Sequence, residues 1–491
     1  MEESPAEVMN FCIFNTELGL KEGLEHEKIM YFYGLSTQTT LKKFTTTTTG
    51  ASNGITQLEL DGQIKQIGLA EAMIQFSSTF SDDGCHFIHT KKTRQVIYNP
   101  EPNYIMKLTV SVPSLVNPPD PGNPFYMEDS VQDSLLDAII KQSYTFFTFF
   151  NRSYTEIFTQ CGVEGLKECL SDFYDKFWSS VSISNLSLLN LFQGIVFLPL
   201  GKNPFLRVHS FVSCIEASFP IIKYTVFCYS YRMVWCSLEQ KYMRIVYRYL
   251  TDFLMPACFD DSSSSYKPKA LGKMKPSSQW GSISGRSTST SIRGNMQSGY
   301  IIGPNNIKDI EQHISTERVY IMVDDCLKTF YFVVYHAYNI TLCLFLESED
   351  PPLHKFYQQL HQCLSAELAT LAQELNENST SSSSDAQYKF LYCNNMNLAV
   401  KSTLHSVSYP YEFQASNELM RLLADMHDDF ECSKHGEIFI RTRDDTWVVG
   451  RRSDQREFFV VLYYKNATLM NVHEEIRKIT NEQFTNVFFV D

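Results

Sequence analysis

The order in which strand and helix patterns follow one another constrains this chain most, because the same order appears three times in 491 residues. Each pass reads as two strands, a helix, three strands and one or two helices. The repeat lies in the topology rather than in the residues themselves. The third pass is the clearest, and its segments in chain order are QYKFLYCNN, MNLAVKST, a helix striped by Leu419, Leu422, Met426 and Phe430, then EIFIRTR, TWVVGRR and REFFVVLYY.

This order resembles the longin (roadblock-like) module, in which a five-stranded antiparallel sheet carries one helix between strands two and three and further helices after strand five. We therefore expect an α/β fold of the α+β type, with three longin-like domains at residues 1–182, 183–380 and 381–491. Polar stretches without periodicity predict two insertions between elements, at 36–63 and 257–298.

Charge and motif content exclude several classes of protein. A net charge of -13 and a pI near 5.5 argue against a nucleic-acid-binding protein, which needs a surplus of Lys and Arg on one surface. The sequence contains no P-loop, no GxGxxG and no HExxH motif, so it predicts no catalytic residue, cofactor or metal site. The acidic start MEESPAEVMNFCIF lacks the features of a secretory signal, and no apolar run reaches about 18 residues, which predicts a cytosolic protein.

A few clusters of reactive side chains need a specific assessment. Two groups have some metal-ligand character, but neither is matched by a second pair of ligands, so we interpret both as ordinary surface residues. Two acid pairs fall between predicted strands, where Asp favours turn geometry. These groups are Cys85 with His86 and His89, Cys432 with His435, Asp324 with Asp325, and Asp444 with Asp445.

The stretch from Ile67 to Phe80 predicts a helix that is apolar on two sides. One broad stripe and one narrower stripe are separated by Ser77. Two interpretations remain open: the helix is buried on both sides within one domain, or one stripe packs on its own sheet while the other faces a partner. The broad stripe consists of Leu69, Ala72, Met73, Phe76 and Phe80, and the narrow one of Ile67, Ala70 and Ile74.

Several segments spread from about residue 10 to Asp491 resemble the Ccz vacuolar-fusion family. They include NFCIFNTELGLKEGLEHEKIMYFY, IGLAEAMIQFSSTF, HTKKTRQVIYNPEPNYIMKLTV, KYTVFCYSYRMVWCSLEQKYMRIVYRYL and TWVVGRRSDQREFFVVL. The resemblance implies an obligate heterodimer with a Mon-type longin subunit, joined in animals by a third, scaffold subunit. It also implies that the complex is a guanine nucleotide exchange factor for a late-endosomal Rab GTPase, which promotes endosome maturation and fusion with the lysosome or vacuole.

By this resemblance, the first domain contributes to a platform that holds the partner or the Rab. We assign Leu69, Met73 and Phe76 to the domain's own core. The interface is then expected to consist of Ile67, Ala70, Glu71, Ile74, Gln75 and Ser78.

An arginine group in the third pass is a second candidate surface. Solvated strand ends explain it, and so does an acidic partner or an anionic lipid headgroup at an endosomal membrane. A peripheral attachment to late endosome, lysosome or vacuole is what the resemblance implies. The competing class is a longin-type adaptor or tether, or a subunit of a related Rab exchange complex of lysosome-related organelles, without exchange activity of its own. The arginines are Arg441, Arg443, Arg451, Arg452 and Arg456.

Overall fold

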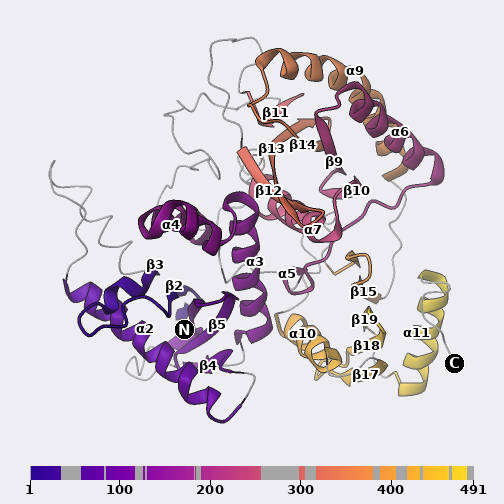
Figure 1. Ribbon diagram of the computed structural model, residues 1–491. Coiled ribbons are helices and arrows are strands. Elements are labelled where there is room, and N and C mark those ends of the chain that lie inside the picture. The colour runs from indigo at the N-terminus through magenta and orange to yellow at the C-terminus, as the bar shows by residue number, and fades with distance from the viewer. Residues whose placement is uncertain are drawn as a thin grey trace. The chain divides into compact units, whose positions relative to one another are not determined.

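Helices and antiparallel sheets alternate through the chain, which confirms the expected mixed α/β class (Figure 1). The chain divides into two compact units, 1–191 and 192–491. The domain limits expected from the sequence stay predictions. The computed structural model describes residues 2–34, 57–81, 84–116, 125–127, 130–181, 183, 189–255, 298–304, 317–379, 388–404, 417–431, 435–463 and 467–483.

The first unit is built on a five-stranded antiparallel sheet of order β3-β2-β6-β5-β4. Helix α2 covers one face, and helices α3 and α4 lie on the other (Figure 1). Because both faces are covered, seven consecutive residues of β6 are buried. The elements are β2 (Val8–Asn15), β3 (Ile29–Gly34), α2 (Gln57–Ser78), β4 (Phe87–His89), β5 (Thr93–Glu101), β6 (Tyr104–Ser111), α3 (Asp133–Asn151) and α4 (Tyr154–Ser180).

Two features of this unit differ from the sequence prediction. Helix α2 begins at Gln57 rather than near Gln66, so the last residues of the expected insertion 36–63 are helical. The part of that insertion from 36 to 56 lies outside the described residues. A small sheet of order β1-β7-β8 was not foreseen, because its strands are too short to show a period. They are β1 (Glu2–Ser4), β7 (Ser114–Val116) and β8 (Phe125–Tyr126).

The first sheet of the second unit has six strands where five were expected. Two short strands, β11 and β12, pair one after the other along the same side of the single long strand β13. Helices α6 and α9 pack on one face of this sheet, and α7 with the π-helical turn η4 lies on the other (Figure 1). The elements are α5 (Leu189–Phe192), α6 (Lys202–Ser218), β9 (Ile222–Tyr229), β10 (Arg232–Cys236), α7 (Gln240–Arg248), η4 (Tyr249–Leu254), β11 (Ser298–Ile302), β12 (Glu317–Val323), β13 (Cys326–Ala337), β14 (Ile340–Leu346) and α9 (His354–Ser379).

The other sheet of the second unit has the five strands expected, in the order β16-β15-β19-β18-β17. Helix α11 packs against the face that presents Val449, and α10 against the opposite face, where Met426 and Phe430 approach Gly450. The elements are β15 (Tyr388–Asn394), β16 (Ala399–Ser402), α10 (Asn417–Glu431), β17 (His435–Arg441), β18 (Trp447–Ser453), β19 (Arg456–Leu462) and α11 (Leu469–Gln483).

A short connecting segment, residues 192–198, joins the edges of these two sheets. Ile195 pairs in parallel with Ala399 of edge strand β16, while Phe197 pairs in parallel with Met233 of edge strand β10. The same stretch of chain therefore covers part of an edge strand in each sheet. This matters because unpaired sheet edges are prone to non-native pairing.

Candidate protein-docking site on helix α2

The buried side of α2 is the narrow stripe. Ile67 and Ala70 are 2% and 1% exposed, and Ile74 is half-buried against the same cluster. Their contacts on the sheet are Cys12, Phe14, Ile97 and Ile105.

The orientation expected from the sequence is therefore wrong. Ile67 and Ala70 were assigned to the partner interface but lie in the domain core, and Ile74 lies at its edge. The physical reason is that both sides of the helix are apolar and each contains one alanine, Ala70 or Ala72, so periodicity does not indicate which side meets the sheet.

The broad stripe, of which Leu69, Met73 and Phe76 were assigned to the core from the sequence, faces solvent instead. Leu69 is 60% exposed, Met73 38%, Phe76 64% and Phe80 77%. The rings of Phe76 and Phe80 pack edge to face with centroids 5.0 Å apart. We call these four residues the apolar ridge. A contiguous row of large apolar side chains on a surface is typical of a protein-docking site, because covering each one is worth about 1.5–3 kcal/mol.

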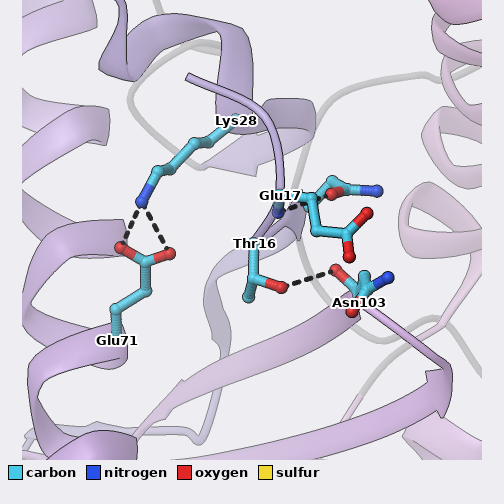
Figure 2. A network of polar contacts seen from close by, with 6 residues as sticks. Thr16, Glu17, Lys28, Glu71 and Asn103 are labelled. Carbon is cyan, nitrogen blue, oxygen red and sulfur yellow. Dashed lines mark hydrogen bonds and ion pairs between the residues drawn. The ribbon is translucent and has the colours of Figure 1, made fainter. Parts of the chain in front are cut away.

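An ion pair fixes the rotation of α2 on its sheet. The Lys28 ammonium, at the end of the 3-10 turn η1 (Glu25–Lys28), donates hydrogen bonds of 2.9 and 2.8 Å to the two carboxylate oxygens of Glu71 (Figure 2). Both side chains are largely buried, at 15% and 18% exposure. Glu71 was expected to face the partner; its carboxylate instead anchors the helix to its own domain.

The remaining predicted interface residues, Gln75 and Ser78, are both exposed on the surface of α2. The Ser78 hydroxyl donates to the backbone carbonyl of Gln75 at 2.8 Å. Both residues stay predictions as partner contacts, at the margin of the apolar ridge.

A hollow of about 350 Å³ lies beside the β5–β6 turn. Asn103 adopts a left-handed conformation there, with φ 69°, and its carbonyl accepts from the backbone N–H of Thr16 at 2.9 Å; Figure 2 draws the longer contact from the Thr16 hydroxyl. Among the described residues that line the hollow, Glu101 carries the one carboxylate. That carboxylate accepts from the backbone N–H groups of Tyr154 and Thr155 at 2.6 and 2.8 Å, so it caps α4 rather than acting on a substrate.

The five arginines do not form one patch. Arg451 and Arg452 are consecutive on β18 and therefore point to opposite faces of the sheet. Arg451 is paired with Glu437, and Arg452 lies 3.2 Å from the buried carboxylate of Glu457. Arg441 pairs with Asp445 at 2.8 Å, which leaves less uncompensated positive charge than the sequence suggested. Arg443 is exposed and Arg456 half-buried; a role in holding an anionic partner stays a prediction for them.

Within the described ranges, no group of three or more His, Cys, Asp or Glu side chains is arranged to hold a metal ion. His89 Nε2 lies 2.7 Å from Asp133, and Asp324 and Asp325 form a left-handed hairpin turn with φ of 50° and 59°. Cys432 lies outside the described residues. The same part of the chain contains no helix long and apolar enough to cross a bilayer.

Three segments of the chain, each containing one of the three large sheets, match three sequence families of one longin series. A family described as "First Longin domain of INTU, CCZ1 and HPS4" matches residues 8–152. The families described as "Intu longin-like domain 2" and "Intu longin-like domain 3" match residues 222–365 and 384–479. The three longin-like domains expected from the order of elements are thereby confirmed.

Similarity to known proteins extends over the whole chain. A protein of Nematostella vectensis called "Vacuolar fusion protein CCZ1 homolog" is 37% identical over 497 residues, covering 100% of this chain and 99% of that protein. Proteins of the same description from Danio rerio and Dictyostelium discoideum are 31% and 27% identical, covering 99% and 97% of this chain and 96% and 97% of their own lengths.

Proposed function

We propose, from the premise that this chain belongs to the family of vacuolar fusion protein CCZ1 homologues, that it acts in fusion at the vacuole or lysosome as one subunit of a guanine nucleotide exchange factor. The GTPase served is a late-endosomal Rab. The observation that carries the proposal is the apolar ridge on α2, which gives the first domain a surface suited to holding another protein.

Exchange of this kind requires binding rather than chemistry. A GTPase keeps its nucleotide through its phosphate loop, its magnesium ion and its switch segments. A partner accelerates release when it binds the nucleotide-free conformation more tightly than the nucleotide-bound one, because only a difference in affinity shifts the equilibrium. A rigid platform serves this purpose, and α2 is held rigidly along its second half by Ile67, Ala70 and the Lys28–Glu71 pair.

The partners follow from the family and from the ridge. We infer an obligate pairing with a Mon-type longin subunit, a further scaffold subunit in animals, and peripheral recruitment from the cytosol to late endosomes, lysosomes or vacuoles. In this proposal the apolar ridge contacts either the Mon-type subunit or the Rab, with Gln75 and Ser78 at its margin.

Nucleotide release from a panel of Rab GTPases tests the proposal. The full chain is co-expressed with a Mon-type subunit, and each Rab is loaded with a fluorescent guanine nucleotide. We expect the assembly to accelerate release from a late-endosomal Rab and to leave Rabs of other compartments at their intrinsic rate. Binding of a Rab without acceleration on any member of the panel would contradict exchange and favour the adaptor or tether.

A further inference from the structure

The two halves of α2 are attached to the sheet by different means. Among residues 58–66 only Gln63 is buried, at 7% exposure. The second half contributes Ile67 and Ala70 to the apolar core. The apolar contacts that α2 makes with the core of the sheet are therefore concentrated after residue 66. The apolar side chains of the first half are exposed or half-buried, and they are Leu58, Leu60 and Ile64.

The sheet face under α2 also carries a polar strip. Lys107 and Thr109, 4% and 5% exposed, lie on β6 on the same face as Ile105, because alternate residues of a strand share a face. Thr109 Oγ1 and, on the adjacent β2, Asn10 Oδ1 are buried and have no hydrogen-bond partner within the described residues. Uncompensated burial of such groups opposes the closed arrangement.

Two glycines weaken the helix itself. A β-carbon on Gly62 or Gly68 would meet nothing within 4 Å, and neither residue has a positive φ. Neither close packing nor backbone conformation in the described structure therefore requires glycine at these positions. Glycine in a helix interior is destabilising relative to alanine, because it loses more conformational freedom on folding.

We propose that the first half of α2, residues 57–66, opens away from the sheet as a local unit while the second half stays docked. Opening gives water access to Thr109 and Asn10, which lie on this face one residue pair beyond Cys12 and Lys107. It leaves the apolar ridge in place, because Ile67, Ala70 and Glu71 hold the part of the helix that follows residue 66. The opening follows from the folding of this chain alone and does not depend on exchange activity.

The opening has a consequence for any partner seated on α2. Leu58 precedes Phe76 by five helical turns, so both lie on the same side of the helix. A partner that spans from the apolar ridge to Leu58 must hold the first half against the sheet. Its affinity is lower because part of the binding free energy is used to close the first half. A partner confined to the ridge binds without that cost. The first half therefore acts as an adjustable extension of the ridge.

Hydrogen–deuterium exchange of the full chain, followed by mass spectrometry, tests this proposal. We expect the amides of 58–66 to exchange at least about tenfold faster than those of 70–76, because local opening exposes only the first half. Gly62→Ala should slow exchange in 58–66 by about fivefold, the factor that corresponds to about 1 kcal/mol of helix propensity, and leave 70–76 unchanged.

A matched control makes the opposite substitution, alanine to glycine, in the second half of α2. Ala72 is exposed on α2, so Ala72→Gly changes helix propensity without a core contact; it should speed exchange in 70–76. Circular dichroism establishes that each variant is folded. Equal protection of 58–66 and 70–76 in the unmodified chain, or equal slowing of both by Gly62→Ala, would mean that α2 opens as one piece and would overturn the proposal.

Discussion

Lys28 and Glu71, 43 residues apart in the chain, form a two-bond ion pair that determines which side of α2 faces solvent. The pair is mostly shielded from water, so its hydrogen bonds are stronger than those of a surface pair. Ile67 and Ala70 set the depth of the helix on the sheet, and this pair sets its rotation.

Glu71→Gln is expected to destabilise the first unit by about 1–2 kcal/mol, because Lys28 then keeps a largely buried charge without its counter-charge. Chemical denaturation monitored by tryptophan fluorescence measures this loss. Lys28→Met combined with Glu71→Gln should cost less than the sum of the two single changes, as a direct interaction requires. Strict additivity would show that the two side chains do not interact in solution.

The two stripes of α2 make opposite predictions for the same substitution. Ile67→Asp should destabilise the first unit by about 3–5 kcal/mol, because it buries an unpaired charge in the core. Phe76→Asp should leave the thermal midpoint nearly unchanged, since Phe76 is 64% exposed. Ile74→Asp should fall between the two, because Ile74 is half-buried. Thermal unfolding followed by circular dichroism ranks the three, and a Phe76→Asp chain that unfolds would place the broad stripe in the core.

The segment 192–198 depends on one glycine. A β-carbon on Gly194 would overlap the side chain of Val400, next to the pairing of Ile195 with β16. Gly194→Ala should therefore lower the stability of the second unit by about 1–3 kcal/mol. Gly201→Ala is the matched control, because its β-carbon would meet only Pro204, at an ordinary 3.8 Å. The difference in thermal midpoint between the two variants is the measurement, and equal midpoints would contradict the close approach.

Half-buried His336 makes the second unit sensitive to acid. Burial lowers the pKa of His336 from 6.5 to about 4, while its Nδ1 lies 3.0 Å from the Thr341 hydroxyl. Between pH 6.5 and 4 the unfolded chain binds a proton that the folded chain does not, so the free energy of unfolding falls as the pH falls. At pH 5 the free energy of unfolding is expected to be lower by about 1–2 kcal/mol because of this histidine. His336→Gln should lose less stability than the unmodified chain between pH 7 and 5; an identical loss would show that this histidine does not contribute.

The order of elements could be predicted because alternation and helical periodicity are local properties of the sequence. The facing of α2 could not, because both of its sides are apolar and periodicity does not indicate which side meets the sheet. Small residues gave no signal either, because each stripe contains one alanine, Ala70 in the narrow stripe and Ala72 in the broad one. The extra strand β11 and the two-sided pairing of Ile195 and Phe197 depend on contacts distant in sequence. The pairing of Arg451 with Glu437 and of Arg452 with Glu457 could not be predicted for the same reason, because these residues become neighbours only in the folded sheet.

Nucleotide release in the presence of ridge variants tests the central claim most directly. The assembly of the chain with a Mon-type subunit is prepared with Leu69→Asp, with Phe76→Asp, and with Leu206→Asp on α6 as a control, since Leu206 is an exposed apolar residue outside the ridge, at 48% exposure. Release from a late-endosomal Rab is then measured at equal concentrations. We predict that the two ridge variants stay folded yet lose either assembly or at least about tenfold in acceleration, while the control retains both. Folded ridge variants that assemble and accelerate release as fully as Leu206→Asp would contradict the docking role of α2.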